Sequence, residues 1–134
     1  MLVELAKYKD SHNFRFHHCD ILAKVCNAPK DKAGIYIVYA IKNKKKELVY
    51  IGRSGKVKSD GSLFIRRGGI WNRLVYGKRD GEARRNFWIR EISSEKMEAL
   101  EIHWYVTHST KFIDCPAELE DNLIKKYSPR WNRT

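Results

Sequence analysis

Two tyrosines stand beside glycines in neighbouring apolar runs of the chain. Tyr36 belongs to the tripeptide GIY at residues 34–36, and Tyr50 belongs to YIG at residues 50–52. A phenol has a pKa of about 10, so it exchanges a proton at neutral pH only with help from nearby cationic charge. If the two runs pair as strands, they would present both phenols at one place. Each tyrosine alone also suits an ordinary strand.

One acid occupies an unexpected position near the end of the chain. Glu120 borders the apolar stripe of a predicted helix, three and four residues before Leu123 and Ile124. An ionised carboxylate buried there without a partner costs several kcal/mol. Glu120 therefore turns to solvent, pairs with an arginine or holds a cation, and the pattern leaves these three alternatives open.

Basic residues gather in the middle of the chain. The formal net charge is +11; residues 53–90 hold 11 Lys and Arg against three Asp and Glu, whereas residues 91–134 hold six against eight. A concentrated field of one sign attracts polyanions, and nucleic acid is the commonest polyanion inside cells. A surface that only keeps a protein in solution more often alternates its charges. We therefore expect a nucleic-acid partner.

The length and composition suit one globular domain over residues 1–134. The first ten residues lack the apolar run of a signal peptide, and no run is long enough to span a bilayer. Three cysteines form no C-x-x-C pair and are too few for a disulfide scaffold. These features predict an intracellular, cytoplasmic protein with no membrane partner.

Hydrophobic periodicity predicts three strands and four helices. The strands are expected at residues 34–41, 48–52 and 86–93, and the first two close an antiparallel hairpin. The helices are expected at about residues 19–26, 70–77, 95–107 and 116–127. Between them, residues 55–69 form a glycine-containing loop, and residues 111–115 form an edge strand or a connection. The fold class is α+β, a small antiparallel three-stranded sheet flanked by helices.

These motifs, taken in chain order, resemble the GIY-YIG nuclease superfamily. GIY and YIG are followed by an arginine on the next predicted helix and by LEDNLIKKYSPRWN at residues 119–132. That last segment is similar to the catalytic end of the UvrC-type repair nuclease module. The resemblance covers about residues 34–132, which would make residues 1–33 an N-terminal extension of the core. Either tripeptide alone is weak evidence, but the ordered set is specific.

The resemblance implies a GIY-YIG-like fold and a metal-dependent DNA endonuclease. Its site residues would be Tyr36 and Tyr50 facing the active site, Arg73 on the scissile phosphate, Glu120 binding a single Mg²⁺ or Mn²⁺, and Asn132 supporting the site. Nucleic-acid contacts are expected from Arg53, Lys56, Arg66, Arg67 and Tyr76. One active site cuts one strand, so double-strand cleavage would require a homodimer. The alternative is a nucleic-acid-binding module of the same fold that does not cleave.

The sequence departs from the family pattern at two places. Residues 55–69 look like an insertion similar to that of the restriction-enzyme branch. Where relatives often place His or Tyr one helical turn after the arginine, this chain has Gly77, preceded by Tyr76. Gly77 mildly favours the non-cleaving module, whereas the presence of Tyr36, Arg73 and Glu120 favours the enzyme.

Overall fold

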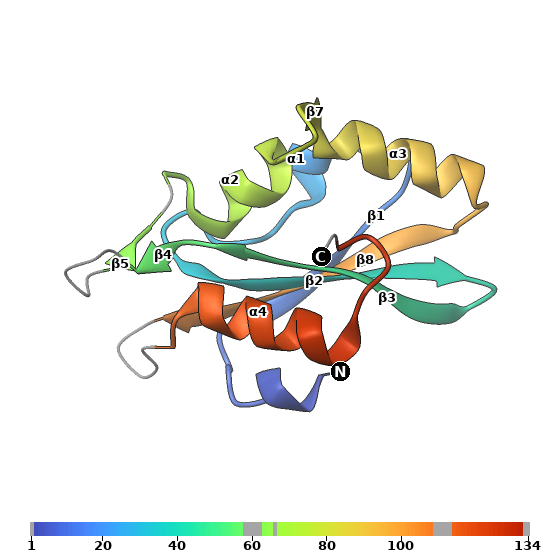
Figure 1. The fold of residues 1–134 in the computed structure, drawn as a ribbon. Coiled ribbons are helices and arrows are strands. Elements are labelled where there is room, and N and C mark those ends of the chain that lie inside the picture. The colour runs from blue at the N-terminus through green and yellow to red at the C-terminus, as the bar shows by residue number, and fades with distance from the viewer. Residues whose placement is uncertain (1, 58–62, 66, 109–113, 133–134) are drawn as a thin grey trace.

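The structure is a computed structural model that describes residues 2–57, 63–65, 67–108 and 114–132 (Figure 1). The elements, in chain order, are the 3₁₀ turn η1 (Val3–Leu5), β1 (Ser11–Phe16), α1 (Leu22–Val25), β2 (Ala33–Lys42), β3 (Lys45–Ser54), β4 (Lys56–Val57), β5 (Leu63–Phe64), α2 (Gly69–Tyr76), β6 (Lys78–Arg79), β7 (Glu82–Ala83), α3 (Arg84–Ser94), β8 (Ala99–His108) and α4 (Pro116–Tyr127). None of these described helices is both long enough and apolar enough to cross a bilayer.

The centre of the molecule is a four-stranded antiparallel sheet with the strand order β1-β8-β2-β3. The predicted α+β class is confirmed, but the predicted number of strands is wrong. Two short ribbons, β4–β5 and β6–β7, lie outside this sheet. Strand β1 comes from the segment expected to precede the core, and it pairs with β8 along the edge opposite β3.

The predicted hairpin is confirmed in β2 and β3, which are longer than expected. Asn43 and Lys44 form its two-residue turn, both with positive φ (52° and 62°), as a turn matching the twist of paired strands requires. A β-bulge follows, since Val38 pairs with Tyr50 and the next residue of β2 pairs with Leu48. The bulge shifts the pairing by one residue, and the shifted register places Tyr36 opposite Gly52.

Two predicted elements have the wrong type. Residues 86–93 were expected to form a strand but belong to helix α3, whose buried positions Arg84, Trp88 and Ile92 follow helical spacing. Residues 95–107 were expected to form a helix, but Ala99–His108 is strand β8. Strand β8 lies between β1 and β2 and is buried on both faces, so its apolar residues run continuously and imitate a wide helical stripe.

The other helices were predicted with varying accuracy. The last helix is confirmed as α4, and the helix expected at 70–77 is confirmed as α2 within a residue. The helix expected at 19–26 is reduced to the four residues of α1. The expected segment at 111–115 falls mostly on residues 109–113, which lie outside the described residues.

Helices cover both faces of the sheet. Figure 1 shows α1, α2 and α3 on one face, and α4 with η1 on the other. Strand β2 alternates between the two: Tyr36 and Val38 join the core beneath α2 and α3, whereas Ile35 and Ile37 join the core beneath α4. The candidate tyrosines are therefore held between the central sheet and helices α2 and α3.

Candidate active site

The two tyrosines lie side by side on neighbouring strands. The rings of Tyr36 and Tyr50 have centroids 6.1 Å apart and are tilted by 34°. Gly52 lies opposite Tyr36, and a Cβ at Gly52 would collide with the Tyr36 ring. A Cβ at Gly34 would likewise collide with the backbone carbonyl of Tyr105 on β8. Each tripeptide thus needs its glycine, because the sheet and the phenols approach it closely.

The hydroxyl of Tyr36 is an unusual buried group. The residue is 0% exposed, and its Oη has no hydrogen-bond partner among the described residues. Leaving a buried polar group unsatisfied costs about 1–3 kcal/mol, and most folded proteins avoid it. Buried groups of this kind call for an explanation, and a partner supplied by bound substrate or water is one.

Tyr50 is held in its protonated form. Burial raises its pKa to about 12, with Tyr36 and Glu120 acting in the same direction and the cations Arg84 and Arg73 opposing them. All four groups therefore lie within electrostatic range of the Tyr50 hydroxyl. At neutral pH this hydroxyl can donate a hydrogen bond to an oxygen placed beside it.

Glu120 extends from α4 to the edge strand β3. Its Oε1 accepts a hydrogen bond from Arg53 Nε at 3.1 Å, and Arg53 Nη1 donates to the carbonyl of Gly55 at 3.0 Å. Of the three alternatives left open by the sequence, pairing with an arginine is the one observed. Arg53, expected to contact nucleic acid, has this partner within the protein.

The electrostatics of Glu120 reflect its partial burial. Burial raises the pKa of Glu120 although Arg53 and Arg73 oppose the effect, and its side chain is 22% exposed. Among the described residues its Oε2 has no hydrogen-bond partner, and no group of three or more His, Cys, Asp or Glu gathers as a metal cluster. One partly open carboxylate fits Mg²⁺ or Mn²⁺, because such a cation keeps several waters and takes further oxygens from substrate.

Arg73 lies in the last turn of α2, on the same side of the sheet as the tyrosine pair. Its charge opposes the rise in the pKa of both Tyr50 and Glu120, so it acts on both groups. Its backbone carbonyl accepts a hydrogen bond from Arg84 Nη1 at 3.0 Å. The structure therefore brings Tyr36, Tyr50, Arg73 and Glu120 to one region.

Asn132 does not point at the phenols but clamps the strand that carries Tyr50. Its Oδ1 accepts from the amide of Ile51 and its Nδ2 donates to the carbonyl of Ile51, both at 2.9 Å. The amide of the preceding Trp131 donates to the carbonyl of Val49 at 2.9 Å. Asn132 therefore occupies the free edge of β3 as a neighbouring strand would, and its expected role in supporting the site stays a prediction.

The residues expected to contact nucleic acid are placed unevenly. Tyr76 is 60% exposed and its ring meets Trp71 edge-on at 5.7 Å, and Arg67 is also exposed. Lys56 lies in β4, and its side chain is outside the described part of the chain. Arg66 lies wholly outside the described residues.

One charged residue at the site was not predicted from the sequence. Arg84, the first residue of α3, is 4% exposed, and its guanidinium carbon lies 5.3 Å and 5.6 Å from the ring centroids of Tyr36 and Tyr50. A Cβ at Gly77 would lie 2.9 Å from that carbon. Gly77 thus leaves the space that Arg84 fills. The available signal was the spacing of four between Arg84, Trp88 and Ile92, which reading this segment as a strand concealed.

Comparisons with protein-family models, with curated proteins and with solved structures found no match to this chain. What the site can do is therefore inferred from its own residues and geometry.

Proposed function

We propose that this protein is a metal-dependent DNA endonuclease of the GIY-YIG type, acting in the cytoplasm on phosphodiester bonds. The observation that carries this inference is the fully buried Tyr36 hydroxyl, without a partner among the described residues, beside Tyr50 and within a site that also holds Arg73 and Glu120. An ordinary core tyrosine would find a hydrogen-bond partner or give way to phenylalanine. Four chemistry-bearing side chains from four separate elements converge there.

Phosphodiester hydrolysis needs an aligned water, neutralised phosphate charge and a stabilised leaving oxygen. Arg73 would neutralise phosphate charge, and the Tyr36 hydroxyl would hydrogen-bond and orient the attacking water. Tyr50, whose pKa burial moves further above neutrality, would donate a hydrogen bond to a phosphate oxygen. Glu120 would hold the cation, whose bound form supplies positive charge to the developing oxyanion.

A plasmid assay tests this function. Purified protein with Mg²⁺ or Mn²⁺ should convert supercoiled DNA to nicked or linear DNA, and EDTA should stop the reaction. Glu120→Gln should lower the rate by at least about 100-fold, the scale expected when a group stabilising transition-state charge is lost. Glu118→Gln is the matched control, because Glu118 is an exposed acid two residues away on the same helix.

DNA binding measured in parallel separates the two candidate functions. Glu120→Gln should bind labelled DNA about as well as the wild type, because the carboxylate holds a cation and not the DNA backbone. Wild-type protein that binds DNA but leaves plasmid intact with either metal would instead identify a non-cleaving module.

A further inference from the structure

We propose that the pocket between β6 and the start of α3, beside Tyr50, binds a second phosphate of the DNA strand, next to the phosphate that is cut. The site would recognise a backbone phosphodiester through Arg84 and Arg79, with Lys78 at its rim. This inference rests on the proposed function for the identity of the ligand. Its evidence is the pocket itself, which is distinct from the position of Glu120.

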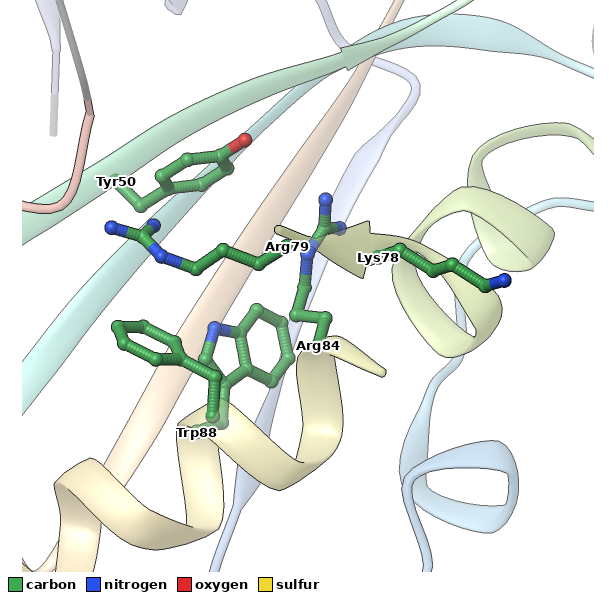
Figure 2. Close-up of a pocket in the computed structure, with 6 residues that line it drawn as sticks. Tyr50, Lys78, Arg79, Arg84 and Trp88 are labelled. Carbon is green, nitrogen blue, oxygen red and sulfur yellow. The ribbon is translucent and has the colours of Figure 1, made fainter. Parts of the chain in front are cut away.

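The pocket is small, aromatic and strongly basic. Its lining residues are Tyr50, Lys78, Arg79, Arg84, Phe87 and Trp88. Figure 2 shows Arg79 extending beneath the Tyr50 ring and Arg84 rising beside it from the start of α3, with Lys78 directed away from both. Of the described residues, three cations and no carboxylate line this pocket. A pocket of this composition is suited to an anion.

Arg84 is the observation that points most directly to a ligand. It is 96% buried, and it forms no ion pair with a carboxylate among the described residues. Its Nη1 donates to the carbonyl of Arg73, and its guanidinium is packed near the rings of Tyr36, Tyr50 and Trp88. Burying a charge without a counter-charge costs several kcal/mol. A phosphate would provide the missing counter-charge through charge-assisted hydrogen bonds.

Arg79 supplies a donor that has no partner among the described residues. Its Nη1 is fixed by the carbonyl of Trp131 at 2.7 Å, and its guanidinium carbon lies 4.2 Å from the ring centroid of Phe87. Its Nε is buried and has no hydrogen-bond partner among the described residues. One end of this guanidinium is therefore held in place while another N–H remains for a ligand.

The start of α3 adds a favourable field. Arg84 is the first residue of this 11-residue helix, and the N-cap residue Ala83 makes no side-chain capping bond. The first turn of α3 also holds no acidic residue, so the positive end of the helix dipole lies at the pocket without an acid of that turn to satisfy it. Tyr50 lines the pocket and also stacks beside Tyr36, so the pocket adjoins the proposed hydrolytic site. The phosphate that reaches it is the neighbour of the one being cut.

The test is DNA binding in EDTA, where no cleavage occurs. Anisotropy of a fluorescein-labelled DNA duplex is measured between about 50 and 300 mM salt, since each phosphate contact contributes about 0.9 to the slope of log K against log salt. Arg84→Met should weaken binding about tenfold at low salt and reduce the slope by about 0.9. Arg84→Lys should retain most of the slope, because it keeps the charge.

Arg85→Met is the matched control. Arg85 is the next residue of α3 and is exposed, so its loss removes the same charge from outside the pocket. It should change affinity by no more than about twofold. Arg79→Met provides an independent reading if Arg84→Met does not fold, and it should reduce the slope similarly.

Inorganic phosphate gives a second readout. It should raise the melting temperature of the wild type but not that of Arg84→Met. Equal slopes and affinities for the wild type, Arg84→Met and Arg79→Met would overturn the phosphate pocket. Absence of plasmid cleavage by the wild type would instead overturn the proposed hydrolysis and leave the binding result standing.

Discussion

A buried hydroxyl without a partner lowers the stability of a folded protein, and within the described part of the chain Tyr36 carries such a hydroxyl in the sheet. Its ring fits closely over Gly52, so the phenol is positioned by the backbone of the next strand. If the hydroxyl serves substrate, the protein retains a destabilising atom for the sake of activity. Stability and activity should then change in opposite directions when that atom is removed.

Tyr36→Phe should raise the free energy of unfolding by about 1 kcal/mol, because it removes an unsatisfied polar atom and preserves the ring. The same variant should lose plasmid cleavage. Denaturant unfolding and the plasmid assay measure the two effects on one preparation. A loss of stability would show that the hydroxyl has a partner in solution and would remove the main support for the proposed site.

Tyr127→Phe is the comparison for this experiment. The Tyr127 hydroxyl donates to Glu4 Oε1 at 2.8 Å, so it is a satisfied phenol. Its removal should not raise the free energy of unfolding, and it should leave cleavage unchanged.

Some residues of the candidate site could be predicted from the sequence. Tyr36, Tyr50 and Glu120 stand out by type and position, and the structure brings them within electrostatic range. The sequence could not decide among the alternatives for Glu120, because its partner Arg53 is 67 residues away in the chain. Arg84 was not predicted because its segment was interpreted as a strand, which concealed its helical spacing to Trp88 and Ile92; that Gly77 opens a space for it is visible in the fold and not in the sequence.

At the level of elements, the outer backbone groups of strand β3 need hydrogen-bond partners. It lies at the edge of the sheet, and unpaired edge groups invite contacts with other chains. Asn132 satisfies both backbone groups of Ile51, the residue directly after Tyr50. The same bonds that cover the edge therefore also fix the strand that presents the phenol.

Asn132→Ala should lower the free energy of unfolding by about 1–3 kcal/mol, since two hydrogen bonds are lost. Amide hydrogen exchange at Ile51 should accelerate more than exchange elsewhere in β2 and β3, because only this amide loses its acceptor. Asn122→Ala, on the exposed side of α4, should alter neither quantity. Unchanged exchange at Ile51 would contradict the clamp.

The two elements whose type was predicted wrongly, α3 and β8, show what limits the prediction of secondary structure from sequence. The hairpin and α4 were recognised because local turn and helix signals agree with their environment. Residues 86–93 contain bulky apolar residues in near-alternation, yet tertiary packing selects a helix with Arg84 and Trp88 inward. Strand β8 has no polar face to reveal a period of two, because neighbours bury both sides. Both errors arise where distant segments, and not local spacing, decide the structure.

Across the whole molecule, one buried acid ties three strands together. Glu101 on β8 is 5% exposed, and it accepts hydrogen bonds from Arg15 on β1 at 3.2 Å and from its neighbour His103 at 2.7 Å. Lys46 on β3 forms an ion pair with it at 2.6 Å. Burial alone would raise the pKa of Glu101, but the bonds from Lys46, His103 and Arg15 outweigh it and lower the pKa to about 2.

This lowered pKa predicts how the protein responds to acid. The folded-state pKa lies below the unfolded value near 4.5, so the stabilisation is present above pH 4.5 and is lost as the pH falls toward 2. The loss should amount to about 1–3 kcal/mol, because 1.36 kcal/mol corresponds to one pKa unit and the half-exposed partners Arg15 and Lys46 are screened by solvent.

Unfolding measured between pH 7 and pH 2 checks this expectation. Glu101→Gln should be less stable than the wild type at pH 7, and the difference should shrink below pH 4.5. Glu118→Gln, which removes an exposed acid, should follow the wild-type curve. If the free energies of unfolding of the wild type and Glu101→Gln fall in parallel as the pH is lowered, the ion pairs of Glu101 do not titrate in this range.

The order of parts along the chain also bears on how the protein is made. Strands β2 and β3 carry both phenols and are synthesised early, whereas Glu120 and Asn132 follow every strand of the sheet. A nascent chain that has emerged only as far as β8 holds neither the acid nor the clamp. On the proposed function, such an unfinished chain would lack both the acid that holds the cation and the clamp on β3, so cleavage would have to await the last helix and the residues that follow it.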